Sequence, residues 1–387
     1  MNSLAHKLIV VAAALLLTAS LSACDSKGSK SEKAENITEL YISKPAGQSV
    51  IRFNATDGIV TKEIMVGMLP HNFKLSHDGS KFYVVLTGSQ AVAELNTATG
   101  EVLRTFLTEP VPKVRDDNSV IQGHIDKDAF SHNTCYDCHR AGSGGPTPVI
   151  VGSRPFGIVI SKDGNTMYVS NGRSGNLSVI DIATGALKKL VPLPPSGTAR
   201  EPTDIVLLDD QLFVTLRPSL PSTAAGAVRR LDVDSLSVLS DTPTGANAGV
   251  ILADAGSHQI YASNFETNTI SRFDTKGALL QTVTVGSGPF GLRFLPEQKQ
   301  MIVANYYANS ISLINLADNQ TQTIPLTFNG KTYANPTHVA LDANRRTAYI
   351  VSSGTVGNLL TFDLQTQQVT RAVPIGSLPF DIMTVPK

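Results

Sequence analysis

A short motif recurs along the chain and constrains the fold more than any other feature of the sequence. Each copy opens with glycine, reaches a proline three residues later and continues into an apolar run. The clearest copies are GMLPHNF (67–73), GSRPFGI (152–158), GSGPFGL (286–292) and GSLPFDI (376–382). Looser copies begin near Glu201, Asn247 and Asn335. Such self-similarity predicts a series of equivalent structural units.

The residues after each motif predict four short strands joined by tight turns. A turn such as SHDGSK (76–81) leads to a second strand, and a hairpin such as ATGA (183–186) joins the third strand to the fourth. Four strands in about 40 to 45 residues are typical of a β-propeller blade. The lines MYVSN (167–171) and MIVAN (301–305) resemble the YVTN β-propeller repeat family, over nearly all of the mature chain. The resemblance implies an all-β, seven-bladed propeller.

The two ends of the chain together supply one blade. Complete repeats begin near residues 66, 152, 201, 246, 286 and 335, and a further one starts at Gly376 but holds a single strand. The N-terminal part offers three strands, at residues 39–43, 49–54 and 60–66. One strand plus three would close the seventh blade and remove the exposed sheet edges. Eight blades is the alternative count.

Composition agrees with this fold and excludes some partners. Only 17% of the 387 residues are charged, and glycine and proline are plentiful, as expected for many short strands and turns. The formal net charge is zero and the pI is about 7. Nothing in this balance favours a nucleic acid as partner.

The N-terminus predicts export and a lipid anchor. Lys7 precedes an apolar stretch at 8–17 that is short for a membrane span. Residues 21–24, Leu-Ser-Ala-Cys, resemble a bacterial lipobox, which implies a signal peptide at 1–23 and acylation of Cys24. The alternative is an ordinary signal peptide cut before a free Cys24. A polar tether (24–37) would lead to the propeller (38–387), and Asp25 favours the periplasmic side of the inner membrane over the outer membrane.

One insertion breaks the repeat and carries the chemistry. The first two clear motifs lie about forty residues too far apart, and the excess is the segment 108–150. It contains Cys135-Tyr-Asp-Cys138-His139, which has the spacing of a c-type haem attachment site. Two thiols at this spacing form thioethers to the haem, and His139 would be an axial iron ligand. A zinc site with His124 or His132 as the fourth ligand and a Cys135–Cys138 disulfide are the alternatives.

The second axial ligand stays open among three histidines. His124 has the longest tether within the insertion and is the first choice. His132 lies so close to the motif that the backbone would have to loop around the porphyrin edge. His71, near the mouth of the adjoining blade, is the candidate from the propeller body.

The repeat also predicts a ring of side chains around the central funnel. It consists of the residues two after each motif proline or its equivalent, which are Asn72, Gly157, Asp204, Gly249, Gly291, His338 and Asp381. His338, Asp381 and Asn72 fall on consecutive blades and are the candidate catalytic or ligand-binding residues, because an imidazole and a carboxylate in one pocket tune each other's pKa. The alternative role is capping of strand ends. The turns after the second strands add rim candidates: Arg173, Arg217, Tyr306 and Tyr307.

These features favour an exported, lipid-anchored c-type cytochrome with one covalent haem c. Its function would be electron transfer to or from a redox protein, with the propeller as docking platform. One alternative is a haem-dependent oxidoreductase with a substrate or second cofactor in the funnel. The other is a non-enzymatic binding or scaffold propeller.

Overall fold

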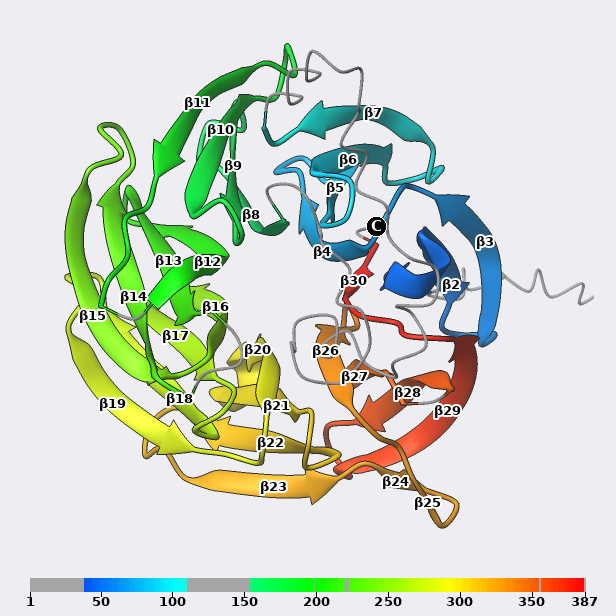
Figure 1. The fold of residues 1–387 in the computed structure, drawn as a ribbon. Coiled ribbons are helices and arrows are strands. Elements are labelled where there is room, and N and C mark those ends of the chain that lie inside the picture. Colours follow the sequence, from blue (N-terminus) through cyan, green and yellow to red (C-terminus); the bar gives the residue numbers. More distant parts are fainter. Residues whose placement is uncertain (1–37, 110–153, 198, 220–222, 355, 386–387) are drawn as a thin grey trace, which may run out of the picture. The chain divides into compact units, whose positions relative to one another are not determined.

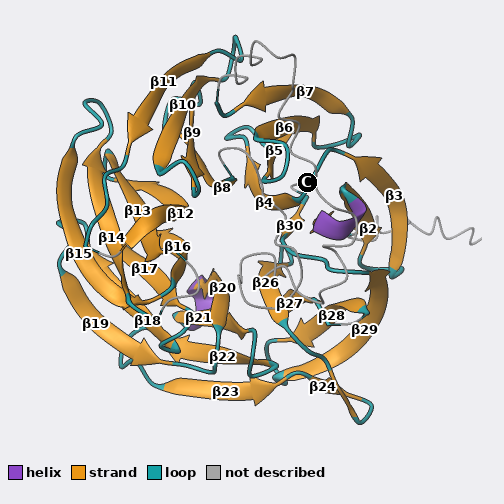
Figure 2. Ribbon diagram, viewed as in Figure 1, coloured by secondary structure: helices purple, strands orange, loops and turns teal. Residues whose placement is uncertain are grey.

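Seven four-stranded antiparallel sheets surround a central channel in the computed structural model, which describes residues 38–109, 154–197, 199–219, 223–354 and 356–385 (Figures 1 and 2). Each sheet is one blade, and each first strand lies nearest the channel. The expected all-β, seven-bladed propeller is therefore confirmed, and the alternative of eight blades is excluded.

The blades follow one another along the chain. Blade I is β4 (Pro70–Leu75), β5 (Lys81–Leu86), β6 (Ala91–Asn96) and β7 (Val102–Leu107). Blade II is β8 (Pro155–Ile160), β9 (Thr166–Asn171), β10 (Asn176–Asp181) and β11 (Leu187–Pro192). Blade III is β12 (Ala199–Leu208), β13 (Gln211–Pro218), β14 (Ala225–Asp232) and β15 (Val238–Ala246). Blade IV is β16 (Ala248–Asp254), β17 (Gln259–Asn264), β18 (Thr269–Asp274) and β19 (Leu279–Thr284).

The remaining blades complete the ring. Blade V is β20 (Pro289–Leu295), β21 (Gln300–Asn305), β22 (Ser310–Asn315) and β23 (Thr321–Pro325). Blade VI is β26 (Pro336–Leu341), β27 (Thr347–Ser352), β28 (Gly357–Asp363) and β29 (Gln368–Gly376). Blade VII is β30 (Ile382–Thr384), β1 (Glu39–Lys44), β2 (Ser49–Asn54) and β3 (Ile59–Met65). A small hairpin, β24 (Thr327–Phe328) with β25 (Lys331–Thr332), precedes blade VI, and the 3-10 turns η1 (Pro45–Gly47) and η4 (Pro296–Gln298) are the helical elements with assigned bounds.

Blade VII closes the ring across the two ends of the described chain. The C-terminal strand β30 pairs antiparallel with β1, with Ile42 opposite Ile382 and Leu40 opposite Thr384. Figure 1 shows β30, in red, next to the blue N-terminal strands. The predicted sharing of one blade, with one strand from the C-terminal side and three from the N-terminal side, is confirmed.

The hydrophobic core lies between neighbouring blades, as expected for sheets packed face to face. Second strands are almost wholly buried, and Met167 of β9 and Met301 of β21 are fully buried. Between blades IV and V, for example, Tyr261 packs with Leu292 and Met301 in one cluster. Outer strands such as β19 expose most of their side chains. Each buried aliphatic side chain contributes about 1.5–3 kcal/mol of stability.

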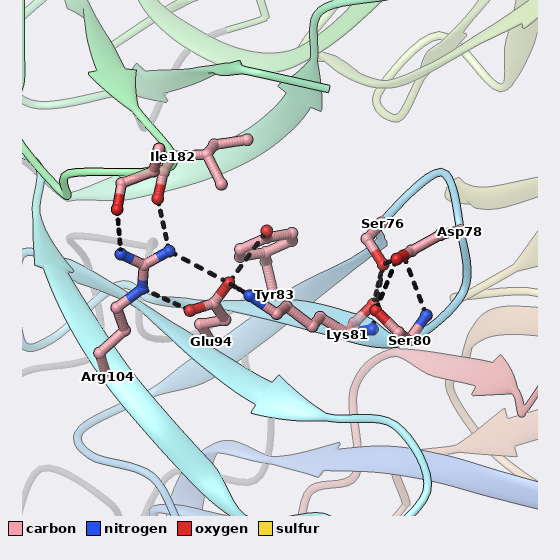
Figure 3. A network of polar contacts seen from close by, with 9 residues as sticks. Ser76, Asp78, Ser80, Lys81, Tyr83, Glu94, Arg104 and Ile182 are labelled. Carbon is pink, nitrogen blue, oxygen red and sulfur yellow. Dashed lines mark hydrogen bonds and ion pairs between the residues drawn. The ribbon is translucent and has the colours of Figure 1, made fainter. Parts of the chain in front are cut away.

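A buried glutamate joins the strands of blade I and helps hold blade II (Figure 3). Glu94 of β6 is 1% exposed and bonds to Arg104 of β7, to Lys81 of β5 (3.1 Å) and to the hydroxyl of Tyr83 (3.2 Å). Arg104 also donates to the carbonyls of Ile182 and Ala183 in blade II. Burial raises the pKa of Glu94, but the two cations outweigh it and hold that pKa below its ordinary value. In the same view, Asp78 accepts bonds from Ser76 and Ser80 within a tight turn.

The two faces of the ring are distinguished by the ends of the strands that lie there. First strands begin and second strands end at the upper face, and first strands end at the lower face. The segment 110–153 leaves and rejoins the described chain at the upper face, through Glu109 after β7 and Arg154 before β8. Within the described ranges, no helix is long and apolar enough to cross a bilayer.

Candidate functional site

A β-bulge near the start of the first strands shapes the channel. In blades I to VI the register between first and second strands shifts over two residues, for example between Pro70 and Phe73. The shift follows the first residue of the strand, except in blade III, where the longer first strand has it between Pro202 and Ile205. A bulge inserts an extra residue and re-aims the side chains beside it. Side-chain hydroxyls of the second strands accept hydrogen bonds from backbone N–H groups in the bulges. Gly157 N–H donates to Ser170 Oγ (2.9 Å), and Asp204 N–H donates to Thr215 Oγ1 (3.0 Å).

The residues directly after the motif proline build an aromatic layer across the channel. Its members are His71, Phe156, Phe290 and Phe380, joined by His338. The Phe380 ring is the centre, with centroids 4.5 Å from His71, 4.9 Å from His338 and 5.5 Å from Phe290. Edge-to-face packing of this kind is favourable at these distances. The layer separates an upper mouth from a lower cavity.

The upper mouth is a small, largely apolar depression with several aromatic side chains. A cavity of about 40 Å³ is lined there by Phe265, Phe290 and Tyr306, and by Arg154 and Arg217 from the flanking blades. Of the rim candidates, Arg217 and Tyr306 line it, Tyr307 is 41% exposed with its ring 5.0 Å from Phe265, and Arg173 is exposed.

Glu201 holds the two arginines of the mouth together. Arg217 donates two hydrogen bonds to its carboxylate, at 3.0 and 3.2 Å, and Arg154 lies 3.7 Å from the same oxygen. Two guanidinium groups share one carboxylate, so the three side chains carry a net positive charge. Cations beside aromatic faces suit a flat ligand that bears negative groups at its edge.

Residues of the predicted ring line a second cavity, of about 130 Å³, below the aromatic layer. Asn72, Asp204, His338 and Asp381 all face it, so the structure brings the three candidate residues together. One position of the ring was predicted wrongly. In blade IV the bulge runs from Ala248 to Ile251, which puts Val250 rather than Gly249 at the equivalent place. Ala248 takes the place of the motif proline there, and without that proline the ring position was predicted one residue too early.

The two aspartates of the ring connect neighbouring first strands. Asp381 accepts the N–H of Phe73 in blade I (2.9 Å) and of Ile382 (2.7 Å). Asp204 accepts the N–H of Ile251 in blade IV (3.1 Å) and of Ile205 (2.9 Å). Burial raises the pKa of Asp204 to about 6, against these hydrogen bonds, and the charge of Asp381 adds to the rise. The predicted alternative of strand capping thus describes part of their role.

His338 and Asn72 are bound differently. His338 Nδ1–H donates to the carbonyl of Phe380 (2.9 Å), which makes Nε2 the hydrogen-bond acceptor of the neutral ring. Burial holds the pKa of His338 below its ordinary value, although the charge of Asp381 acts in the opposite direction. The side-chain oxygen of Asn72 is buried and has no hydrogen-bond partner within the part of the chain that the structure describes.

Two cations in this cavity were not among the predicted site residues. Lys74 of β4 and Arg293 of β20 each lie two residues after the ring position and line the same cavity. Burial lowers the pKa of Lys74, Arg293 lowers it further, and Asp204 raises it. The sequence carries a signal for them, because the equivalent positions of the other first strands are apolar: Val159, Val206, Leu252, Ala340 and Met383.

The predicted haem and lipid residues lie outside the described ranges. These are Cys24, His124, His132, Cys135, Cys138 and His139. His71 is described: it is 1% exposed, its Nδ1–H donates to the Leu69 carbonyl (2.8 Å), and burial lowers its pKa to about 4. Across the described ranges, no three His, Cys, Asp or Glu side chains gather as metal ligands.

Known proteins resemble this chain in fold. Neither a protein-family model nor a curated protein sequence matches it. The periplasmic gluconolactonase of Pseudomonas aeruginosa aligns with a TM-score of 0.62 at 16% identity, over 90% of this chain and 99% of its own. Hydrazine synthase of Kuenenia stuttgartiensis aligns with a TM-score of 0.58 at 15% identity, over 87% and 92%. Virginiamycin B lyase of Staphylococcus aureus gives 0.55 at 14% identity, over 81% and 87%. At such identities the likeness shows the fold alone.

Proposed function

We propose that this chain is an exported, lipid-anchored c-type cytochrome with one covalent haem, which carries electrons to or from a redox protein. Cys135 and Cys138 would form the thioethers, His139 would be an axial ligand, and Cys24 would carry the lipid. The bound haem supplies one-electron oxidation and reduction. The periplasmic side of the inner membrane is the proposed location.

The observation that carries the proposal is the position of the insertion's two ends. Glu109 and Arg154 belong to adjoining blades at the upper face, and Arg154 itself lines the aromatic mouth. Asn176 of blade II donates to Glu109 (3.0 Å), and the Thr108 carbonyl accepts a bond from Ser178, so the first junction is held against blade II. The segment with the haem attachment motif therefore leaves the described chain at the upper face and rejoins it at a residue that lines the mouth.

The mouth suits the chemistry of a porphyrin. The depression of about 40 Å³ is too small to enclose a porphyrin, so its apolar lining would shield only an edge of the ring from water. Arg154 and Arg217 bring two guanidinium groups to this mouth, and such groups suit the anionic propionates. These side chains would bind and orient the group.

His71 has the protonation state that an iron ligand from the propeller body needs. Its low pKa keeps the imidazole neutral, and its Nδ1–H bond to a backbone carbonyl is the second contact that ligating histidines commonly make. His124 and His132 remain the candidates from the insertion.

The test of the function is covalent haem in the full-length protein. The chain is expressed with a c-type maturation system, unfolded, and extracted with acidified solvent before absorption spectroscopy. We expect the haem to stay with the protein, and to be lost in the double variant Cys135→Ala, Cys138→Ala. Protein without covalent haem after such expression would refute the proposal, and with it the haem-dependent oxidoreductase, leaving the scaffold alternative.

The sixth ligand is assigned by three single variants and one matched control. His124→Gln, His132→Gln and His71→Gln are compared by the spin state of the ferric haem, with His338→Gln, which lines the lower cavity, as the buried control. We expect one of the three to change the spin state and the control not to. A change with His338→Gln instead would contradict placement of the haem at the upper mouth.

A further inference from the structure

The lower cavity carries positive and negative groups in separate places. It is bounded by first strands of blades I to VI and by Asp381, directly before the first strand of blade VII, so it lies on the channel axis. Asn72, Asp204, His338 and Asp381 occupy the ring position next to the aromatic layer. Lys74 and Arg293 stand two residues further along their strands, toward the lower face. None of these groups has a role in the proposed haem site.

The cation end opens to solvent. Lys74, Leu252 and Arg293 also line a groove of about 710 Å³ on the lower face, so a ligand has a way into the cavity. Neither Lys74 nor Arg293 forms an ion pair or side-chain hydrogen bond with another described residue. Burial at the same time lowers the pKa of Lys74. Two unpaired, partly buried cations at one opening attract an anionic group.

The opposite end is rich in hydrogen-bond acceptors. The buried Asn72 oxygen has no hydrogen-bond partner in the described chain, which is unfavourable for a buried acceptor. Nε2 of neutral His338 is an acceptor, because its Nδ1 carries the proton. Each carboxylate oxygen of Asp204 and Asp381 accepts one backbone N–H and keeps a second lone pair. Several hydrogen-bond acceptors at one end of the cavity favour a positively charged group that can donate several hydrogen bonds.

The spacing of the two ends limits the length of the ligand. Two residues along a strand advance about 6.6 Å. A ligand that bonds at both ends must therefore bring its negative and positive groups within a few ångströms of each other. The walls between are apolar, formed by Ile158, Val250 and Leu292, and leave room for a small apolar substituent.

We propose that the lower cavity binds a small α-amino acid as its zwitterion. The carboxylate would pair with Lys74 and Arg293, and the ammonium group would donate to Asn72, His338 and the two aspartates. An α-amino acid joins the two charges through one carbon, which matches the short cavity. Its net charge of zero also matches a cavity with two cations and two carboxylates. This inference is independent of the haem.

The test is calorimetric titration of the full-length protein with L-alanine. Three probes each lack one feature: propionate lacks the ammonium group, ethylamine lacks the carboxylate, and lactate carries a hydroxyl in place of the ammonium. We expect L-alanine to bind at least tenfold more tightly than any of the three. Equal or tighter binding of propionate or lactate would overturn the assignment, as would no binding of L-alanine.

Variants locate the site. Lys74→Met and Arg293→Met should each weaken L-alanine binding tenfold or more. Asn72→Leu should weaken binding to a similar extent, because it removes an acceptor for the ammonium group at the opposite end of the cavity. Lys62→Met, on the exposed outer strand β3, is the matched control and should leave binding unchanged. Lys74 and Arg293 are partly exposed, so their variants should fold, as circular dichroism will verify. Unchanged affinity in folded Lys74→Met and Arg293→Met proteins would refute the site.

The haem proposal can fail without affecting this result. The same titration is repeated on the Cys135→Ala, Cys138→Ala double variant, and we expect the L-alanine affinity to be the same as in the unaltered chain. Loss of binding in that variant would contradict the independence of the two sites.

Discussion

Alanine at Gly291 should destabilise the propeller, because two first strands approach too closely there for a side chain. A Cβ built at Gly291 lies 2.5 Å from the carbonyl oxygen of Thr337 and 2.8 Å from the Cα of His338, both backbone atoms of blade VI. These atoms cannot rotate away as the end of a long side chain could. The backbone would have to separate by about 0.9 Å to reach ordinary van der Waals contact.

The expected effect is a loss of about 1–3 kcal/mol in the free energy of unfolding, the usual range for overpacking. A smaller opposing gain, of about 0.4–1 kcal/mol, comes from the lower chain entropy of unfolded alanine. Gly249 provides the control, since the nearest atom to its Cβ is the Ser263 hydroxyl at 3.2 Å. Gly249→Ala should therefore be neutral to within about 0.5 kcal/mol.

Equilibrium unfolding in guanidinium chloride measures both variants against the unaltered protein. The midpoint should fall for Gly291→Ala at an unchanged slope, and should stay in place for Gly249→Ala. Gly157→Ala, whose Cβ would lie 2.6 Å from the Cα of Asp204, should behave like Gly291→Ala. Equal midpoints for all three variants would refute the close approach of first strands around the lower cavity.

Three further changes test other parts of the structure. Glu94→Gln should lower the free energy of unfolding by about 2 kcal/mol, because it leaves Arg104 without its carboxylate. Since the pKa of Glu94 is depressed, this loss should shrink as the pH falls below about 4.5, as denaturation at pH 7 and pH 3.5 will measure. An equal loss at the two pH values would contradict the ion pair. The raised pKa of Asp204 makes ionisation destabilising, so the stability of the unaltered chain relative to Asp204→Asn should fall by about 2 kcal/mol between pH 4 and pH 7. A rise over that range in the same denaturation series would have the wrong sign. Truncation after Gly376 removes β30 with the fully buried Ile382 and leaves β1 without its inner partner. The midpoint of thermal unfolding, followed by circular dichroism, should therefore drop by a large amount. An unchanged midpoint would exclude closure of the ring by β30.

The repeat in the sequence predicted the architecture because every blade packs equivalent apolar side chains against its two neighbours. Met167 and Met301 stand at the same position of the repeat, in second strands, so their burial could be predicted from the repeat alone. The closure of blade VII followed from counting strands at both ends. The hairpin β24–β25 lies between repeats, where the period gives no information.

The site could be predicted only in part. Asn72, His338 and Asp381 were identified because they stand at one position of the repeat, yet the division of the channel into two levels was not. That division depends on the bulge, which in blade I brings His71 and Asn72 to the channel one after the other and which has no motif of its own. Lys74 and Arg293 were missed because only the ring position was compared between blades.

Peptide mass spectrometry of the protein purified from cells with a c-type maturation system tests the central claim most directly. The account predicts that the proteolytic peptide containing Cys135 and Cys138 carries the mass of one haem, bound through both cysteines. The same peptide found unmodified, or with an internal disulfide in place of the haem, would contradict it.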